Sequence, residues 1–374
     1  MSNHAAVDQF SARLAQLAVE VRAAAAAAAV ITPGPDLSYL LGHSVDSHER
    51  LTCLVVPGTG TPVLVLPELE RLGWSGSSAE SLGLDIRTWI DGADPYAEVA
   101  TVLSAVSALI AVGNHMPAVQ ALTLRAAVPG SELILAGPMI AELRMRKDAD
   151  EIEYLALAGA AIDRVHNRMG EWLRAGRTER EVAADIAVGM VEEGHARPDF
   201  VIVGSGPNAA SPHHDASDRV IQPGDAVVVD LGGPVPAGYF SDSTRTYQVA
   251  GEAHPELAAV HAVVRRAQAA AVAAVRPGAT AESVDAAARR VVVDAGYGQY
   301  FITRTGHGIG LEVHEEPYIV AGNSRLLEPG MSFSIEPGIY LPGKFGVRIE
   351  DIVAVTEDGV RNLNQSSTAL TVVG

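Results

Sequence analysis

The chain has 374 residues, of which 48% are hydrophobic and 19% are charged, and its formal net charge at pH 7 is −18. This composition supplies enough apolar material for packed cores, and the length is typical of two domains. The negative charge argues against nucleic acid and anionic membranes as partners, because both are bound through basic patches.

A single cysteine, Cys53, excludes an intramolecular disulfide and a zinc site built from cysteines. Its neighbours are mostly apolar, so we predict a buried thiol in a strand. The alanine-rich run 23–29 is far shorter than the roughly 20 apolar residues that span a bilayer, and it lacks a cleavable signal pattern. We therefore expect a cytoplasmic protein with no membrane partner.

The first 143 residues predict a small α/β domain. We expect helices over 7–30, 98–109 and 118–127, and strands over 51–56, 62–66 and 109–112. The first helix is predicted from its many alanines, which are strong helix formers. The segment 57–61, Pro-Gly-Thr-Gly-Thr, is typical of a hairpin turn between two of the strands. No catalytic spacing is evident in this region.

The charged stretch 143–148 predicts the boundary to a second domain, which we expect over 144–374. Asp148 is a candidate cap for a helix that begins with acidic residues. Thr178 and Glu181 form a capping-box pattern for a helix over 178–193. Two further helices are predicted over 256–275 and 281–295, and strand-rich segments follow each helix pair. This order fits an α+β domain with helices packed on one face of an antiparallel sheet.

Four carboxylates are predicted at the ends or on the polar faces of strands: Asp230 after 226–229, Asp242 in 239–246, Glu336 in 331–336 and Glu350 in 347–353. An isolated buried charge is very costly, so each needs compensation. A salt bridge or a helix cap would explain any single one. Four of them together with a histidine favour divalent cations, and oxygen ligands with one imidazole suit manganese or cobalt, with zinc as a further candidate.

Two histidines, His307 and His314, lie seven residues apart across Gly308 and Gly310. On one straight strand they would point to opposite faces, and each glycine weakens a helix by about 1 kcal/mol. If both rings serve one site, we expect the chain to bend at the glycines.

Several segments resemble the metal-dependent pita-bread peptidases, the family of methionine aminopeptidase, aminopeptidase P and prolidase. The matching motifs occur in the family's order at 203–208, 212–214, 229–232, 241–246, 306–310, 313–317, 335–340 and 347–351. The N-terminal segment is similar to the proline-specific branch, since methionine aminopeptidases generally lack it. The resemblance implies a C-terminal pita-bread domain and a smaller N-terminal creatinase/prolidase-like α/β domain.

The resemblance also implies a ligand set for two divalent metal ions per subunit: Asp230, Asp242, His307, Glu336 and Glu350. Asp242 and Glu350 would bridge both ions, manganese being the expected metal and cobalt or zinc the alternatives. A hydroxide held by both ions would attack the carbonyl before proline, with Glu336 as the proton acceptor.

Further side chains are implied to contact the substrate. His213 and His314 would hold the substrate and the tetrahedral intermediate, and Arg348 and Tyr340 are further candidates for substrate binding. A purely structural ion pair is the alternative for Arg348. His214 is expected to take no part.

Three features depart from the family's pattern. The interval from Asp230 to Asp242 is one residue longer than expected. Thr303 stands where related proteins often carry a histidine. Tyr318 stands where some dipeptidases place an arginine for the substrate's carboxylate, and Arg325 is a candidate substitute.

The resemblance implies hydrolysis of the Xaa-Pro bond, with dipeptides as the first choice of substrate, and a homodimer is expected. Xaa-Pro aminopeptidase activity on longer peptides is the close alternative. Creatinase-like hydrolysis without metal and a non-catalytic peptide-binding module are less favoured, because all five ligands are present in the sequence.

Overall fold

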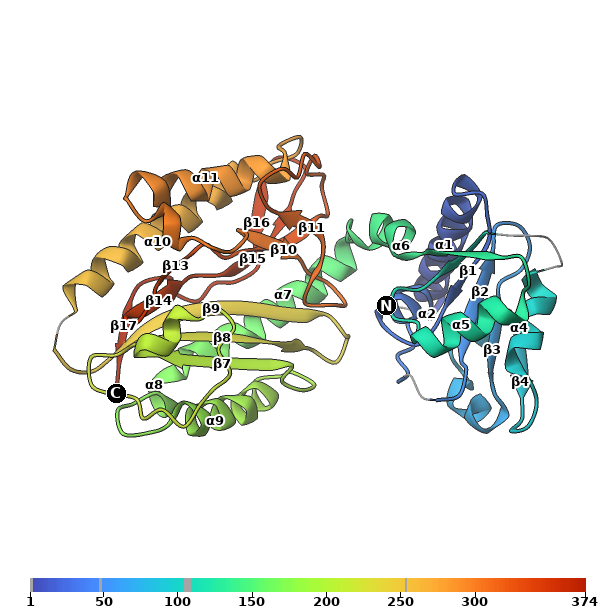
Figure 1. The fold of residues 1–374 in the computed structure, drawn as a ribbon, viewed down its shortest axis with the longest axis horizontal. Helices are drawn as coiled ribbons and strands as arrows, with labels where there is room; N and C mark the ends of the chain where they lie inside the picture. The colour runs from blue at the N-terminus through green and yellow to red at the C-terminus, as the bar shows by residue number, and fades with distance from the viewer. Residues whose placement is uncertain (1–2, 47–48, 104–108, 253) are drawn as a thin grey trace. The chain divides into compact units, whose positions relative to one another are not determined.

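The computed structural model describes residues 3–46, 49–103, 109–252 and 254–374 (Figure 1). The chain divides into two compact units, Met1–Arg144 and Met145–Gly374, each with its own hydrophobic core. Within the described ranges, no helix is both long enough and apolar enough to cross a membrane.

The smaller unit is built on a mixed sheet with the strand order β4-β3-β2-β1-β5-β6. Its strands are β1 Ala26–Ile31, β2 Cys53–Pro57, β3 Val63–Pro67, β4 Asp85–Trp89, β5 Leu109–Val112 and β6 Glu132–Leu135. Its helices are α1 Asn3–Ala23, α2 Pro35–Leu41, α3 Ser78–Ser81, α4 Pro95–Leu103, α5 Ala118–Ala127 and α6 Gly137–Arg144, with a 3-10 helix η1 at Glu68–Trp74. β2 and β3 are antiparallel neighbours and Cys53 is fully buried, which confirms the predicted hairpin and strand thiol.

The predicted helix over 7–30 is wrong at its C-terminal end. α1 ends at Ala23, Ala25 adopts a left-handed backbone with φ 54°, and the chain continues as β1. β1 lies between β2 and β5 and is almost entirely buried. The helix preference of alanine is small, so burial of this segment in the sheet outweighs it. The end of the helix predicted over 98–109 lies outside the described residues.

In the described part of the larger unit, the strands form sheets with the orders β17-β9-β8-β7, β11-β10-β12-β15-β16 and β13-β14. The strands are β7 Phe200–Ser205, β8 Ala226–Pro234, β9 Phe240–Val249, β10 Gly306–Gly308, β11 Glu315–Ile319, β12 Ser332–Ile335, β13 Gly338–Leu341, β14 Phe345–Arg348, β15 Asp351–Val355, β16 Val360–Asn362 and β17 Thr371–Val373. Their pairings are antiparallel except that of β17 with β9.

Helices cover the outer faces of these sheets (Figure 1). They are α7 Ala149–Asn167, α8 Met169–Trp172 and α9 Glu179–Glu192 on one side, and α10 Pro255–Ala274 and α11 Ala281–Asp294 on the other, with short 3-10 helices η2 Gly206–Ala210 and η3 Gly298–Tyr300. The predicted packing of helices on one face of a sheet therefore applies to each layer separately. Asp148 caps α7 and Thr178 forms a capping box on α9, as predicted. Asp148 also forms a reciprocal box with Glu151, and both boxes satisfy free N–H groups of their helices.

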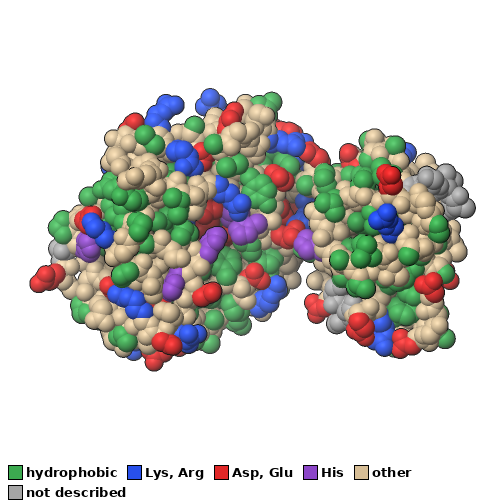
Figure 2. Space-filling view, in the orientation of Figure 1, with side chains coloured by type: hydrophobic (Ala, Val, Ile, Leu, Met, Phe, Trp, Pro, Cys, Tyr) green, Lys and Arg blue, Asp and Glu red, His purple; other side chains and the backbone are tan. Residues whose placement is uncertain are grey.

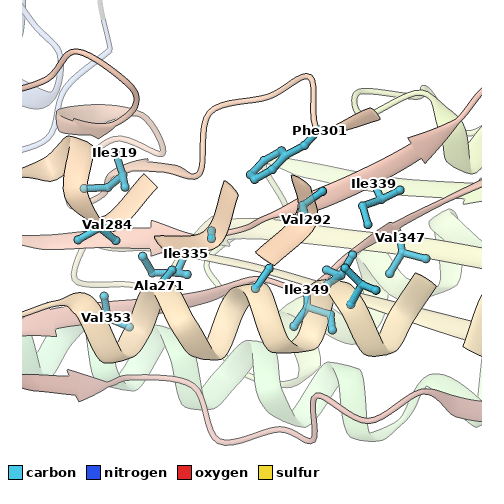
Figure 3. Packing of buried hydrophobic residues seen from close by; sticks show 14 of the residues in the cluster. Ala271, Val284, Val292, Phe301, Ile319, Ile335, Ile339, Val347, Ile349 and Val353 are labelled. Carbon is cyan, nitrogen blue, oxygen red and sulfur yellow. The ribbon is translucent and has the colours of Figure 1, made fainter. Parts of the chain in front are cut away.

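Two cores fix these helices to the strands. Ala271 of α10 and Val284 and Val292 of α11 pack with Ile335 and Val353 in one core (Figure 3). A separate core joins α7, α8 and α9 to β7, β8 and β9. The inner faces of β8 and β9 lie against β14 and β15, so polar side chains between the two layers are removed from water.

The strand predicted over 347–353 is divided in the structure. β14 ends at Arg348 and pairs with β13, whereas β15 begins at Asp351 and pairs with β12. The chain thus changes sheets at Ile349 and Glu350. This change places Glu350 between the two layers rather than on the face of one continuous strand.

Candidate metal centre

The β8–β9 hairpin presents two carboxylates on one face. Asp230 lies opposite Thr244 and Asp242 lies opposite Gly232 in the antiparallel register. Because alternate residues of a strand share a face, Asp230 and Asp242 project from the same side of the hairpin. The shared face predicted for Asp242, Thr244 and Thr246 is consistent with their contacts, since Thr244 and Thr246 both bond to the segment 348–350.

Three side chains from the opposing layer meet this face. His307 lies on β10, Glu336 directly follows β12, and Glu350 lies between β14 and β15. The Nε2 atom of His307 is 3.4 Å from Oδ2 of Asp242 and 3.2 Å from Oε1 of Glu336. One ligand atom each from Asp242, His307 and Glu350 lie within 4.8 Å of one another, and all three residues are buried.

The histidine ring is oriented by its other nitrogen. Nδ1 of His307 donates to the carbonyl oxygen of Gly308 at 3.1 Å, which leaves Nε2 facing the carboxylates. A backbone partner of this kind is typical of metal-binding histidines, because it sets the tautomer and the ring orientation. Ser334 supports the same arrangement, since its hydroxyl accepts from the His307 N–H and donates to Glu336.

The glycines around His307 are required by close packing of strands. A Cβ atom on Gly306 would lie 1.9 Å from the carbonyl oxygen of Ser334, and one on Gly308 would lie 2.2 Å from that of Glu316. Any side chain at either position would therefore push β10 away from β12 or β11. Interstrand distance thus explains the glycines at 306 and 308, and the bend expected at Gly308 and Gly310 stays a prediction.

Arg348 connects the two layers through hydrogen bonds to both. Its Nη2 donates to Asp230 at 2.6 Å and its Nε donates to the hydroxyl of Thr244 at 2.9 Å. The Thr244 hydroxyl in turn donates to Oε2 of Glu350 at 2.6 Å. Nη1 of Arg348 bonds to the Tyr340 hydroxyl at 2.8 Å. The guanidinium of Arg348 thus holds two predicted ligands in place, Asp230 directly and Glu350 through Thr244.

The electrostatics of this cluster disfavour four free carboxylates. Burial raises the pKa of Asp242 to about 7, and the negative charge of Asp230 acts in the same direction. Burial also raises the pKa of Glu350 well above its usual value, with the charge of Asp242 as the next cause. Burial opposes protonation of His307, but hydrogen bonds to Asp242 and Glu336 raise its pKa well above the usual range. The cluster therefore attracts positive charge.

The residues fit a bound metal ion. Oδ1 of Asp230 is buried and has no hydrogen-bond partner in the described part of the chain, although buried carboxylate oxygens are normally paired. The Nε2 atom of His307 and the carboxylates of Asp242 and Glu350 offer the nitrogen and oxygen donors that borderline divalent metals accept.

The other predicted site residues surround this cluster. The ring of His314 contacts that of His307 edge-on, with centroids 4.1 Å apart, and the imidazole of His213 is close enough for its charge to affect the pKa of His314. Figure 2 shows histidine side chains on the visible face of the larger unit, with acidic and basic side chains beside them. Tyr340 and Arg348 are buried and bond to each other, so the structure gives both a partner within the protein.

Glu179 is a buried carboxylate that sequence reasoning missed. Glu179 is fully buried and accepts hydrogen bonds from Ser205, Asn208, His214 and Ser217. These bonds fasten the segment that also contains the predicted substrate residue His213. His214 therefore has a structural partner, at 2.8 Å from Glu179, where the sequence suggested no role. The polar side chains within 205–217 were the only signal for this contact in the sequence, because Glu179 lies on a helix that is distant in the chain.

The departures from the family's pattern also have defined surroundings. The hydroxyl of Thr303 is buried and has no hydrogen-bond partner among the described residues, while its carbonyl accepts from Arg289 at 3.0 Å. Tyr318 lies on β11 beneath the guanidinium of Arg304. Arg325 lies in the loop after β11, and its carbonyl accepts from the N–H of Ala281 at the start of α11.

Comparison with known families gives a match over most of the chain. Residues 153–357 match metallopeptidase family M24, and residues 13–146 match the creatinase/prolidase N-terminal domain.

Individual relatives cover nearly the whole chain. A probable dipeptidase PepE of Mycobacterium bovis is 54% identical over 364 residues, which are 97% of this chain and 96% of the relative. An Xaa-Pro dipeptidase of Lactobacillus helveticus is 37% identical over 90% of this chain and 92% of its own. The crystal structure of dipeptidase PepE from Mycobacterium ulcerans superposes with a TM-score of 0.93 at 54% identity, covering 98% of both chains.

Replacing Glu179 by glutamine should destabilise the protein by about 2 kcal/mol at pH 7, because charge-assisted hydrogen bonds are lost. Burial opposes ionisation of Glu179, but hydrogen bonds from Ser205 and Ser217 outweigh it and lower the pKa to about 2. A depressed folded-state pKa contributes stability above the unfolded value of 4.5 that is lost as the pH falls towards 2.

The difference in thermal midpoint between wild type and Glu179→Gln should therefore be smaller at pH 3.5 than at pH 7. Glu357→Gln is the control, because Glu357 is exposed. A difference that stays constant with pH would contradict the role assigned to the carboxylate.

Gly308→Ala should lower stability by about 1–3 kcal/mol, as overpacking does, and should reduce the rise in thermal midpoint caused by manganese, because β10 and His307 must shift. Gly170→Ala is the matched control, since a Cβ there meets nothing within 4 Å. Equal midpoints and equal manganese responses for the two variants would show that the close packing does not position the histidine.

Proposed function

The chain belongs to metallopeptidase family M24, and from that premise we propose that it hydrolyses the Xaa-Pro bond of dipeptides. The observation that carries the proposal is the convergence of ligand atoms from Asp242, His307 and Glu350 within 4.8 Å, in a buried site that contains further carboxylates. The substrate class is supported by the Xaa-Pro dipeptidase of Lactobacillus helveticus, which aligns with 90% of this chain.

We propose two divalent metal ions per subunit, manganese first and cobalt or zinc as alternatives. They would be held by Asp230, Asp242, His307, Glu336 and Glu350. Two such ions carry four positive charges, which balances the four carboxylates while His307 binds as a neutral imidazole. Bound ions of this kind supply Lewis acidity, which lowers the pKa of water and polarises a peptide carbonyl.

The protein's own groups would provide the proton acceptor and the substrate contacts. Glu336 would be the proton acceptor for the attacking water, because its carboxylate lies within the ligand set, 3.2 Å from Nε2 of His307. Burial lowers the pKa of His314. A neutral His314 can donate a hydrogen bond to the substrate, and His213 would act beside it.

Arg348 and Tyr340 act on this site through their hydrogen bonds. Arg348 holds Asp230 directly and Glu350 through Thr244, and the Tyr340 hydroxyl fixes the guanidinium. Their predicted contact with the substrate remains part of the proposal. In this arrangement they would orient the ligands as well as border the bound peptide.

We also propose the domain roles and the assembly. Residues 144–374 would form the catalytic domain and residues 1–143 the N-terminal creatinase/prolidase-like domain, in a homodimer located in the cytoplasm. Xaa-Pro aminopeptidase activity on longer peptides is the second candidate function. It is favoured by one observation, the presence of Tyr318 where some dipeptidases place an arginine.

The two candidates are separated by substrate length. With manganese present, Ala-Pro should be hydrolysed with a higher kcat/KM than Ala-Pro-Ala, measured by the release of free alanine. Glu336→Ala should lose activity by at least about a hundredfold and keep its fold, because the proton acceptor is removed. Faster cleavage of the tripeptide would favour the aminopeptidase, and activity unaffected by chelation of the metal would contradict the proposed hydrolase.

A further inference from the structure

One half-buried arginine of the larger unit has no carboxylate partner in the described part of the chain. Most arginines of this unit form ion pairs, as Arg245 does with Asp351 and Arg348 does with Asp230. Apart from Arg304, some arginines of this unit have no side-chain ion pair or hydrogen bond among the described residues. All of them are exposed: Arg174, Arg265, Arg266, Arg276 and Arg290. Arg304 differs because its side chain is partly removed from water.

Arg304 lies on the chain segment that leads into the candidate metal centre. It lies three residues before His307, and the next residue, Thr305, donates its N–H to the carbonyl of Ile319 on β11 at 3.0 Å. The side chain of Arg304 reaches Tyr318, and its guanidinium carbon lies 4.7 Å from the centre of the tyrosine ring. The guanidinium is thus held on an aromatic surface that occupies none of its hydrogen-bond donors.

A backbone contact ties this segment to the site. The N–H of Glu336, one of the proposed ligands, donates to the carbonyl oxygen of Thr305 at 2.8 Å. Arg304 therefore directly precedes a residue that is hydrogen-bonded to the site.

Arg304 and Arg348 differ in their charge partners. Arg348 compensates Asp230 inside the cluster, whereas Arg304 contacts none of the four carboxylates. A partly desolvated guanidinium with its donors free presents the planar fork that matches a carboxylate. The missing partner is expected to arrive with the substrate.

We propose that Arg304 binds the terminal carboxylate of the dipeptide substrate and thereby selects dipeptides over longer peptides. The inference rests on the proposed Xaa-Pro hydrolysis and names the residue that sets its substrate length. Only three covalent bonds separate the scissile carbonyl carbon from the carboxylate carbon of an Xaa-Pro dipeptide. The recognising cation must therefore lie at the immediate edge of the site, where Arg304 is held.

A longer peptide lacks this charge at the corresponding position. In Ala-Pro-Ala the carboxylate of proline is replaced by an amide, which cannot form an ion pair with the guanidinium. Tyr318 then has a defined function, because its ring supports the arginine from the neighbouring strand. Arg325 is the rival, since it lies in the next loop and was the substitute suggested by the sequence.

The test compares Ala-Pro with Ala-Pro-amide, which differ only in the charge of the carboxyl group. For Arg304→Ala, KM for Ala-Pro should rise at least about tenfold, as expected for a lost charge-assisted ion pair, while KM for the amide should change less than about twofold. Arg304→Lys should recover part of the loss, because it restores the charge without the fork. Arg290→Ala, an exposed arginine on α11, should leave both substrates unchanged.

A binding measurement separates this inference from the proposed function. Calorimetric titration of the manganese-loaded protein with proline and prolinamide, the two reaction products, requires no turnover. Proline should bind Arg304→Ala at least about tenfold more weakly than wild type, and prolinamide should bind both equally. The assignment would be overturned if Arg304→Ala lost affinity equally for proline and prolinamide, or for neither. It would also be overturned if only Arg325→Ala lost affinity for proline selectively. Either result would count even if wild type cleaves Ala-Pro. Wild type that cleaves neither substrate with manganese, cobalt or zinc would refute the proposed function itself.

Discussion

The larger unit depends on the burial of several carboxylates at one point between two β layers. Asp230, Asp242 and Glu350 are each almost fully buried, and Glu336 lies beside them. Among the arginines and lysines of the described ranges, Arg348 alone forms an ion pair with this group, through Asp230. Ionised carboxylates at this density are unstable without further positive charge. The arrangement of these carboxylates therefore fits a metal site, and the surrounding strands and helices hold the carboxylates in place.

The fold achieves this by bringing unrelated strand ends close to each other. The β8–β9 hairpin supplies two carboxylates from one layer, and the change of sheet at Glu350 supplies a third from the other. Ordinary side chains then fix the positions, as Thr244 does for Glu350 and Ser334 does for Glu336. Loss of such partners from around a metal site typically weakens metal affinity or activity, so these hydroxyl groups belong to the function as much as the ligands do.

Much of the fold and of the site could be predicted where the sequence signal came from residues close together in the chain. The capping box of Thr178 and the alternation around Asp242 depend on residues a few positions apart, and both occur in the structure. The C-terminal end of the helix predicted over 7–30 was wrong, because alanine's helix preference is weak and the burial of β1 in the sheet cannot be read from the segment itself. Glu179 and the pairing of Arg304 with Tyr318 depend on contacts between distant segments, which only the register of the strands reveals.

The central claim is that the buried carboxylates bind divalent metal ions, and metal content tests it most directly. The purified chain would be loaded with manganese, freed of excess metal by gel filtration, and analysed for bound metal per chain. The geometry and charge predict two ions for wild type and a clear loss for Asp242→Asn, which keeps the shape of the side chain but removes its charge. A folded wild-type chain that retains no manganese, cobalt or zinc would contradict the claim.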